Sequence, residues 1–188
     1  MKPKKNREGK SGAGYDCCQT PPYAVTPILW ALHLKGIKTI WECAAGEGAI
    51  ADELAREGFK VARSDILTGH DFFDYTPNPR LYDAIVTNPP YSIKYKWLAR
   101  CYEIGKPFAL LMPLEVLGAQ HAQIYFRNHG VGIILLSRRV NFKMPRKGYG
   151  GHGAQFPVAW FTWGLGVTSL YYHDLIIPDE FKNKRSKR

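Results

Sequence analysis

Apolar residues are grouped along this chain in short runs, and segments with helical spacing separate these runs. Short unbroken apolar runs are typical of strands that are buried on both faces of a sheet. We expect strands at residues 38–43, 59–62, 82–87, 108–112, 131–136 and 156–163, with a short extra strand at 169–173. We expect helices at residues 21–34, 49–56, 96–104 and 114–128.

The order of these elements predicts the fold class. Strands that alternate with helices predict an α/β fold, in which a mostly parallel, twisted sheet is covered by helices on both faces. Ligands of such sheets bind beyond the carboxyl ends of the strands. We expect a single domain over residues 15–176, preceded by a flexible basic arm at residues 1–14 and followed by a basic tail at residues 177–188.

The composition excludes several classes of protein. The chain has 188 residues, of which 45% are hydrophobic and 22% charged, so it is neither disordered nor fibrous. No apolar run approaches the roughly 20 residues that cross a bilayer, and the first residues lack the apolar core of a signal peptide. Neither the four cysteines nor the histidines have the spacing of a metal site. We therefore expect a cytoplasmic protein with reduced thiols, no metal and no membrane partner.

The positive charge is unevenly distributed. The formal net charge is +10, and much of the excess lies at the two ends of the chain. Residues 42–83 are predominantly acidic, whereas residues 116–173 contain no Asp or Glu. A basic tail by itself often only keeps a protein soluble, but a long acid-free stretch favours a polyanionic partner such as nucleic acid.

A glycine turn lies between the first predicted strand and the helix that follows it. Its sequence, Gly46-Glu47-Gly48-Ala49-Ile50-Ala51, matches the G-x-G-x-x-G/A pattern, and Asp65 lies near the end of the next strand, where a carboxylate can bind ribose hydroxyls. The pattern fits NAD, S-adenosylmethionine or a tight turn without a ligand. Glu42 stands just ahead of the turn, where its carboxylate favours a cationic methionine group and would repel a pyrophosphate.

The most informative segment is Asn88-Pro89-Pro90-Tyr91, which follows the strand predicted at residues 82–87. Two consecutive prolines fix the backbone and remove two N–H donors, so that carbonyl oxygens point outward. The Asn88 side chain and the Pro89 carbonyl are acceptors suited to the two N–H groups of an exocyclic amine, and Tyr91 provides a flat surface for a base. A rigid strand-to-loop corner without chemistry is the alternative. The segment predicts a catalytic site that acts on a planar nitrogen.

These motifs resemble those of the class I S-adenosylmethionine-dependent amino-methyltransferases, in particular the DNA N6-adenine methyltransferases with the Asn-Pro-Pro-Tyr motif, including small phage-type members. The resemblance covers about residues 15–163, and its segments occur in the family's order. These segments are residues 20–22, 24–25, 40–48, 61–66, 71–73, 88–91 and 138–142. The resemblance implies the Rossmann-like class I methyltransferase fold, with an antiparallel strand near the C-terminus. It also implies direct in-line methyl transfer from S-adenosylmethionine to a flipped or unpaired adenine.

The resemblance assigns individual site residues as well. Asp65 would bind the ribose hydroxyls of the cofactor, Asp71 would bind its adenine amine, and Phe72 would pack on the adenine ring. The full set expected to bind the cofactor is Thr20, Pro21, Glu42, Cys43, Ala44, Gly46, Gly48, Asp65, Ile66, Asp71, Phe72 and Asn88. The residues expected to be catalytic are Asn88, Pro89, Pro90 and Tyr91.

A basic, glycine-rich stretch at residues 138–155 is the candidate recognition loop. The residues expected to contact nucleic acid are Arg138, Arg139, Phe142, Lys143, Arg146 and Lys147. Phe142 matches an aromatic residue that the family uses against the extruded base. Little sequence follows residue 163, so we expect modification at short or nonspecific sites, or a partner that supplies sequence recognition. The alternatives are methylation of an RNA base or of a protein glutamine, and a nucleic-acid-binding module without catalysis.

Overall fold

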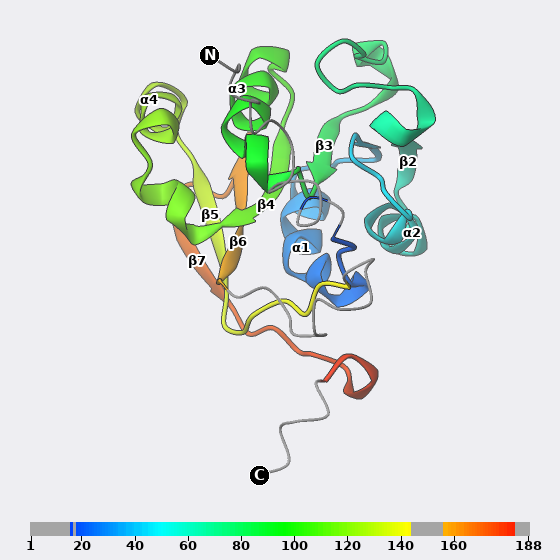
Figure 1. Cartoon of the computed structure of the whole chain (residues 1–188), viewed down its shortest axis with the longest axis vertical. Coiled ribbons are helices and arrows are strands. Elements are labelled where there is room, and N and C mark those ends of the chain that lie inside the picture. The colour runs from blue at the N-terminus through cyan, green and yellow to red at the C-terminus, as the bar shows by residue number, and fades with distance from the viewer. Residues whose placement is uncertain (1–15, 17, 144–155, 183–188) are drawn as a thin grey trace, which may run out of the picture.

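Seven strands form one sheet in the computed structural model, which describes residues 16, 18–143 and 156–182 (Figure 1). Their order across the sheet is β2 (Lys60–Arg63), β1 (Thr39–Glu42), β3 (Ala84–Thr87), β4 (Phe108–Pro113), β6 (Val158–Trp163), β5 (Gly132–Leu136) and β7 (Leu170–His173). Neighbouring strands are parallel except that β6 runs antiparallel to both β4 and β5. The predicted α/β fold is confirmed, including the antiparallel strand near the C-terminus.

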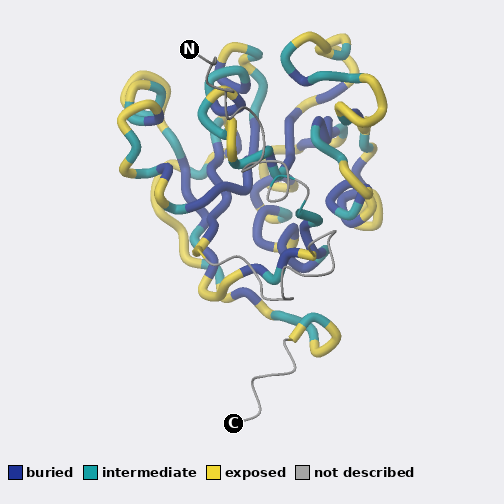
Figure 2. Tube along the Cα trace, viewed as in Figure 1, coloured by how far each residue is buried: buried dark blue, intermediate teal, exposed yellow. Residues whose placement is uncertain are grey.

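Helices cover both faces of the sheet, as predicted. The two buried clusters place α1 (Thr26–Leu34) and α2 (Ala49–Arg56) on one face, and α3 (Lys94–Ile104) and α4 (Gln120–His129) on the other (Figure 1). Side chains alternate between these clusters, so that Ile40 of β1 packs in the first and its neighbour Trp41 in the second. Figure 2 shows the result, with central strands buried and the outer turns of the helices exposed.

The helix predicted at residues 21–34 is interrupted. It consists of a 3₁₀ helix, Pro22–Ala24, followed by α1. Pro27 explains the interruption, because it has no N–H to donate to residue 23 and its ring would clash with the carbonyl there.

The helix predicted at residues 114–128 is also interrupted. A 3₁₀ helix, Leu114–Gly118, ends at Ala119, whose backbone is extended (φ −80°, ψ 126°), and α4 begins at the next residue. Gly118 is a weak helix former and directly precedes this break.

The sheet brings the candidate site segments to one edge. β2 and β3, the next two strands along the chain, lie on opposite sides of β1 in the sheet. Such a reversal of strand order is a switch point, and it opens a crevice at the carboxyl ends of the strands. Glu42 ends β1 and Thr87 ends β3. Since β4 and β5 both run antiparallel to β6, the basic segment that follows β5 starts at this same edge.

The chain beyond β7 returns to the body of the protein. In the 3₁₀ helix Asp179–Phe181, the Phe181 ring lies 5.2 Å from that of Tyr23, and its carbonyl accepts a hydrogen bond from the Asn141 side chain at 2.9 Å. The first residues of the predicted basic tail therefore contact the domain, while the predicted arm and residues 183–188 lie outside the described residues. Within the described ranges, no helix is both long and apolar enough to span a membrane.

A substitution at Gly132, the first residue of β5, tests the packing of the sheet. A methyl group there would lie 2.1 Å from the Val167 carbonyl oxygen, so the backbone must shift. We expect Gly132→Ala to lower the free energy of unfolding by about 3 kcal/mol, measured by urea denaturation. Gly118→Ala is the control, because no heavy atom lies within 4 Å of its added methyl. Equal stability of the two variants would contradict the described packing of β5.

Candidate active site

A cavity of about 340 Å³ lies at the carboxyl ends of β1 and β3. It is lined by the segment before η1, the glycine turn, the loop after β2 and the corner between β3 and α3. Most of the predicted cofactor and catalytic residues line it, namely Thr20, Cys43, Ala44, Gly46, Asp65, Ile66, Asp71, Phe72, Asn88 and Pro90. The remaining ones, Pro21, Glu42, Gly48, Pro89 and Tyr91, are outside the lining.

The glycine turn uses its backbone donors within the chain. The N–H groups of residues 45–48 donate, in order, to the Ser64 carbonyl (3.1 Å), the Asp65 carboxylate (2.9 Å), the Gln19 side-chain oxygen (3.0 Å) and the Ala45 carbonyl (2.7 Å). Glycine turns that bind a pyrophosphate direct such N–H groups at the phosphates. Residues 45–48 of the turn therefore offer no free N–H group to a pyrophosphate.

Both glycines of the turn have a backbone that other residues adopt only with strain. Gly46 has φ +52° and a methyl group there would lie 2.9 Å from the Gln19 side chain. Gly48 has φ +91° and precedes the first residue of α2. The close approach of Gln19 places the segment before η1 directly over the turn.

Asp65 connects the glycine turn to the loop after β2. One carboxylate oxygen accepts from Gly46 N–H, and the other accepts from Leu67 N–H at 2.8 Å and caps the 3₁₀ helix Ile66–Thr68. Each carboxylate oxygen has two acceptor sites. The side chain can therefore hold the loop and still accept hydrogen bonds from a ligand's hydroxyl groups in the cavity.

Glu42 is the buried carboxyl group of the site. Its side chain is fully buried, one oxygen accepts a hydrogen bond from the Thr87 hydroxyl at 2.5 Å, and the other has no partner among the described residues. Desolvation by burial raises the pKa of Glu42 from 4.5 to about 8, against the lowering effect of the Thr87 hydroxyl. A cation beside this carboxyl would favour its ionised form.

Aromatic rings form one wall of the cavity. The Phe72 ring stacks on Trp97 of α3, with centroids 4.0 Å apart and planes at 11°, and only 2% of Phe72 is exposed. Phe73 lines the cavity next to it. Trp97 is an additional residue of the cavity that was not predicted, although it lies on the helix that follows the Asn-Pro-Pro-Tyr segment. Its indole N–H is buried and finds no acceptor among the described residues.

Asn88 presents an unpartnered acceptor at the cavity. It follows the last residue of β3, and its side-chain oxygen is buried without a donor in the part of the chain that the structure describes. Pro89 behind it is buried, and the Pro90 carbonyl accepts from Ile93 N–H at 3.2 Å at the start of a 3₁₀ helix, Tyr91–Ile93. A buried acceptor of this kind fits an N–H donor supplied by a ligand.

Tyr91 lies outside the cavity lining and belongs to an aromatic group. Its ring centroid lies 6.4 Å from that of Phe142 and 5.8 Å from that of Phe156. Burial raises the pKa of the Tyr91 hydroxyl well above its usual value, and this hydroxyl has no partner among the described residues. Phe156, which follows the basic loop in sequence, is an additional residue of this group that was not predicted.

The predicted nucleic-acid residues are only partly within the structure. Arg138 and Arg139 are exposed just after β5. Lys143 forms a backbone bridge with Gln19 and an exposed ion pair with Glu47 at 3.2 Å, so it lies next to the glycine turn. Arg146 and Lys147 lie outside the described residues.

Asp71 is a further residue that we expected to bind the cofactor. Asp71 lines the cavity and accepts from Phe73 N–H at 2.9 Å, which shapes the loop that carries Phe72. In the described residues, no group of three or more His, Cys, Asp or Glu side chains has the arrangement of a metal site.

The raised pKa of Glu42 predicts a pH-dependent stability. Below pH 4.5 the carboxyl is protonated in both states; as the pH rises toward about 8, only the unfolded state ionises, so the folded state loses stability. We expect Glu42→Gln to be more stable than wild type by a margin that grows over this range to a few kcal/mol, on the order of 1.4 kcal/mol per pKa unit. Denaturant unfolding at several pH values measures it, with exposed Glu57→Gln as control. A margin that does not change with pH would contradict the burial of Glu42.

Comparison with known proteins supports the fold. No family model matches the chain, and no curated protein matches it. A solved structure of a candidate RNA methyltransferase from Pyrococcus horikoshii is similar, with a TM-score of 0.55, 14% sequence identity, and coverage of 85% of this chain and 91% of that one. A predicted O-methyltransferase from Agrobacterium tumefaciens matches with a TM-score of 0.35 and 16% identity over 74% of this chain and 67% of that one, which is too weak to support an argument. The chain shares the Rossmann-like α/β fold of the archaeal protein.

Proposed function

We propose that the protein transfers a methyl group from S-adenosylmethionine to the exocyclic amine of a nucleobase, and that adenine N6 in DNA is the favoured target. The observation that carries this proposal is the buried, unpartnered side-chain oxygen of Asn88 at the cavity. It accepts an N–H, as an amine substrate requires, and the two prolines after it keep it in a rigid corner.

The cavity fits S-adenosylmethionine better than a dinucleotide. The N–H groups of the glycine turn are satisfied within the chain, which disfavours a pyrophosphate. Glu42 has an unpartnered buried oxygen behind the turn, and a cationic ligand would favour its carboxylate form. Asp65 lines the cavity and would accept hydrogen bonds from ribose hydroxyls. When bound, S-adenosylmethionine would supply a methyl group on a positively charged sulfur that departs with the electrons of the broken S–C bond.

The chain's own residues orient the target nitrogen. Asn88 would accept one N–H of the amine and leave the nitrogen lone pair directed at the methyl carbon, and the nitrogen then releases its surplus proton to solvent. A base in a duplex must leave the stack to reach the cavity, which costs a few kcal/mol, about the strength of one or two stacking contacts. The exposed Phe156 ring, 5.8 Å from the Tyr91 ring, is a surface on which such a base could stack, whereas Phe142 is buried in the core.

Nucleic acid is the polymer that the charge distribution favours. Arg138 and Arg139 are exposed at the cavity edge of the sheet, in a stretch of sequence without acidic residues. Their phosphate contacts would offset the cost of extruding the base. RNA is a second candidate, because the archaeal protein with the same fold is described as a candidate RNA methyltransferase. For either polymer we propose modification at short or nonspecific sites, or a partner that supplies sequence recognition.

Asn88→Ala tests the reaction directly. We expect transfer to fall by about 10²–10³-fold, as when a single preorganised hydrogen bond to a transition state is lost, while S-adenosylmethionine binding is retained. Unmethylated DNA and RNA are incubated with protein and cofactor, digested to nucleosides and analysed by mass spectrometry for N6-methyladenine.

Asn128→Ala, on the exposed face of α4, is the matched control and keeps wild-type activity. Methyladenine in RNA alone would favour the second candidate. Methylation of a protein glutamine, or binding of nucleic acid without any methylated nucleoside, would contradict the proposal.

The two exposed arginines test nucleic-acid binding. We expect the double variant Arg138→Ala/Arg139→Ala to bind DNA more weakly and to lower the slope of log K against log salt by about 0.9 for each phosphate contact removed. Fluorescence anisotropy at several salt concentrations measures this slope. Arg80→Ala is the control, because Arg80 is exposed in the acidic part of the chain, and we expect this variant to leave the slope unchanged. Equal slopes for all three proteins would exclude Arg138 and Arg139 from the interface.

A further inference from the structure

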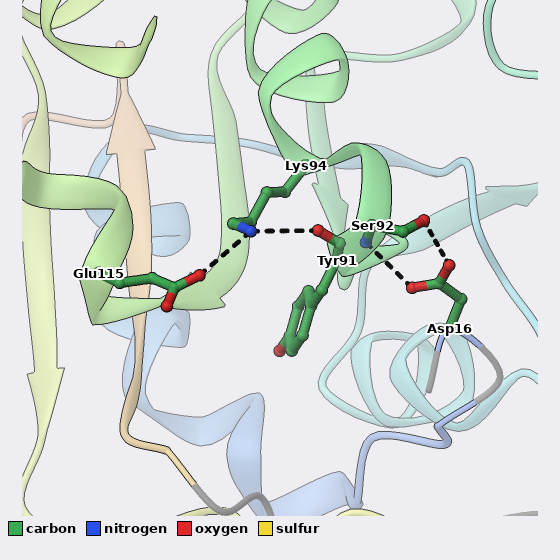
Figure 3. Close-up of polar contacts among 5 residues, drawn as sticks. All are labelled: Asp16, Tyr91, Ser92, Lys94 and Glu115. Carbon is green, nitrogen blue, oxygen red and sulfur yellow. Dashed lines mark hydrogen bonds and ion pairs between the residues drawn. The ribbon is translucent and has the colours of Figure 1, made fainter. Parts of the chain in front are cut away.

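The Asn88–Tyr91 corner is held by two charged residues that lie outside the motif. On one side, Asp16 accepts two hydrogen bonds from Ser92, from its backbone N–H at 3.1 Å and from its hydroxyl at 2.5 Å (Figure 3). Asp16 and Ser92 are 76 residues apart in sequence, and both line the cavity together with Asn88.

A cation holds the opposite side of the corner. The Lys94 ammonium donates to the Tyr91 carbonyl at 3.3 Å and pairs with Glu115 at 3.2 Å. The Lys94 side chain is only 14% exposed, so this interaction is shielded from solvent. Figure 3 shows Lys94 and Asp16 on opposite sides of the backbone at Tyr91 and Ser92.

These contacts matter because the prolines fix the corner only as far as Pro90. Beyond it, no proline restrains Tyr91 and Ser92, and a small displacement there would move Asn88 relative to the cavity. Reaction rates depend steeply on such placement, with a 1 Å error costing about 10²-fold.

The segment that carries Asp16 also reaches the cofactor side of the cavity. Gln19 accepts from the Glu47 N–H of the glycine turn at 3.0 Å, and Thr20 lines the cavity beside it. Asp16 and Gln19 are close in sequence, and they form hydrogen bonds with the catalytic corner and with the glycine turn, respectively.

We infer that Asp16 is a positioning residue, which through Ser92 holds the Asn88–Tyr91 corner in register with the glycine turn. The inference rests on the proposed function, because it concerns the geometry of methyl transfer. Asp16 does not contact the reacting atoms; it fixes the backbone that presents the Asn88 acceptor.

The kinetic test compares Asp16→Ala and Ser92→Ala with the wild-type protein. We expect each to lower kcat by about 10–100-fold, with KM for S-adenosylmethionine and the melting temperature nearly unchanged. The double variant is no slower than the slower single one, because both remove the same pair of hydrogen bonds. Ser92→Thr keeps the hydroxyl and restores most of the activity lost in Ser92→Ala. Asp74→Ala, an exposed acid elsewhere, is the control.

Wild-type kcat in Asp16→Ala, or additive losses in the double variant, would overturn the inference. A wild-type protein without transferase activity would instead refute the proposed function. In that case backbone amide exchange at Asn88, Tyr91, Ser92 and Ile93, followed by mass spectrometry, decides the inference independently. Faster exchange in Asp16→Ala than in Asp74→Ala supports it, and equal exchange overturns it.

Discussion

The backbone N–H groups of residues 45–48, in the glycine turn between β1 and α2, are all satisfied within the chain, and this constraint shapes the cavity. Ser64 and Asp65 approach the turn from the loop after β2, and Gln19 approaches it from the segment before η1. The turn therefore acts as an anchor for two loops rather than as a cradle for phosphates. A ligand at this site meets the Asp65 carboxylate and apolar walls, with the buried Glu42 behind the turn.

The sheet order brings two different chemical requirements to one place. Because β1 and β3 are parallel neighbours, Glu42 at the end of β1 accepts a hydrogen bond from Thr87 at the end of β3, and Asn88 is the next residue. A buried carboxyl that responds to a cation therefore lies close to an acceptor that requires an N–H donor. This combination suits the transfer of a methyl group from a sulfonium to an amine, and it results from strand pairing between segments far apart in sequence.

Much of this arrangement could be predicted from local sequence. Apolar runs predicted the strands, because strands buried on both faces cannot tolerate polar residues, and the motifs at residues 46–48 and 88–91 predicted which edge carries the site. Contacts between distant segments could not be predicted, since periodicity holds no information about them. Asp16 at Ser92 and Lys143 at Glu47 are such contacts. The helix interruption at Ala119 was missed as well, although Gly118, a weak helix former, directly precedes it.

The packing partners of the aromatic residues could not be predicted from local sequence either. The family resemblance implied that Phe72 packs on the adenine ring of the cofactor, but it did not show that Trp97 already stacks on Phe72. Similarly, Tyr91 was expected at the site, whereas its ring packs with Phe142 and Phe156 beside the cavity. Aromatic residues have large apolar surfaces that serve core and ligand equally well, so only the three-dimensional arrangement separates the two roles.

The identity of the cofactor is tested most directly by calorimetric titration of the purified protein with S-adenosylmethionine and, separately, with NAD. We expect saturable binding of S-adenosylmethionine at one site and no binding of NAD, because the N–H groups of residues 45–48 are already satisfied within the chain and Glu42 would repel a pyrophosphate. Binding of NAD without binding of S-adenosylmethionine would contradict it.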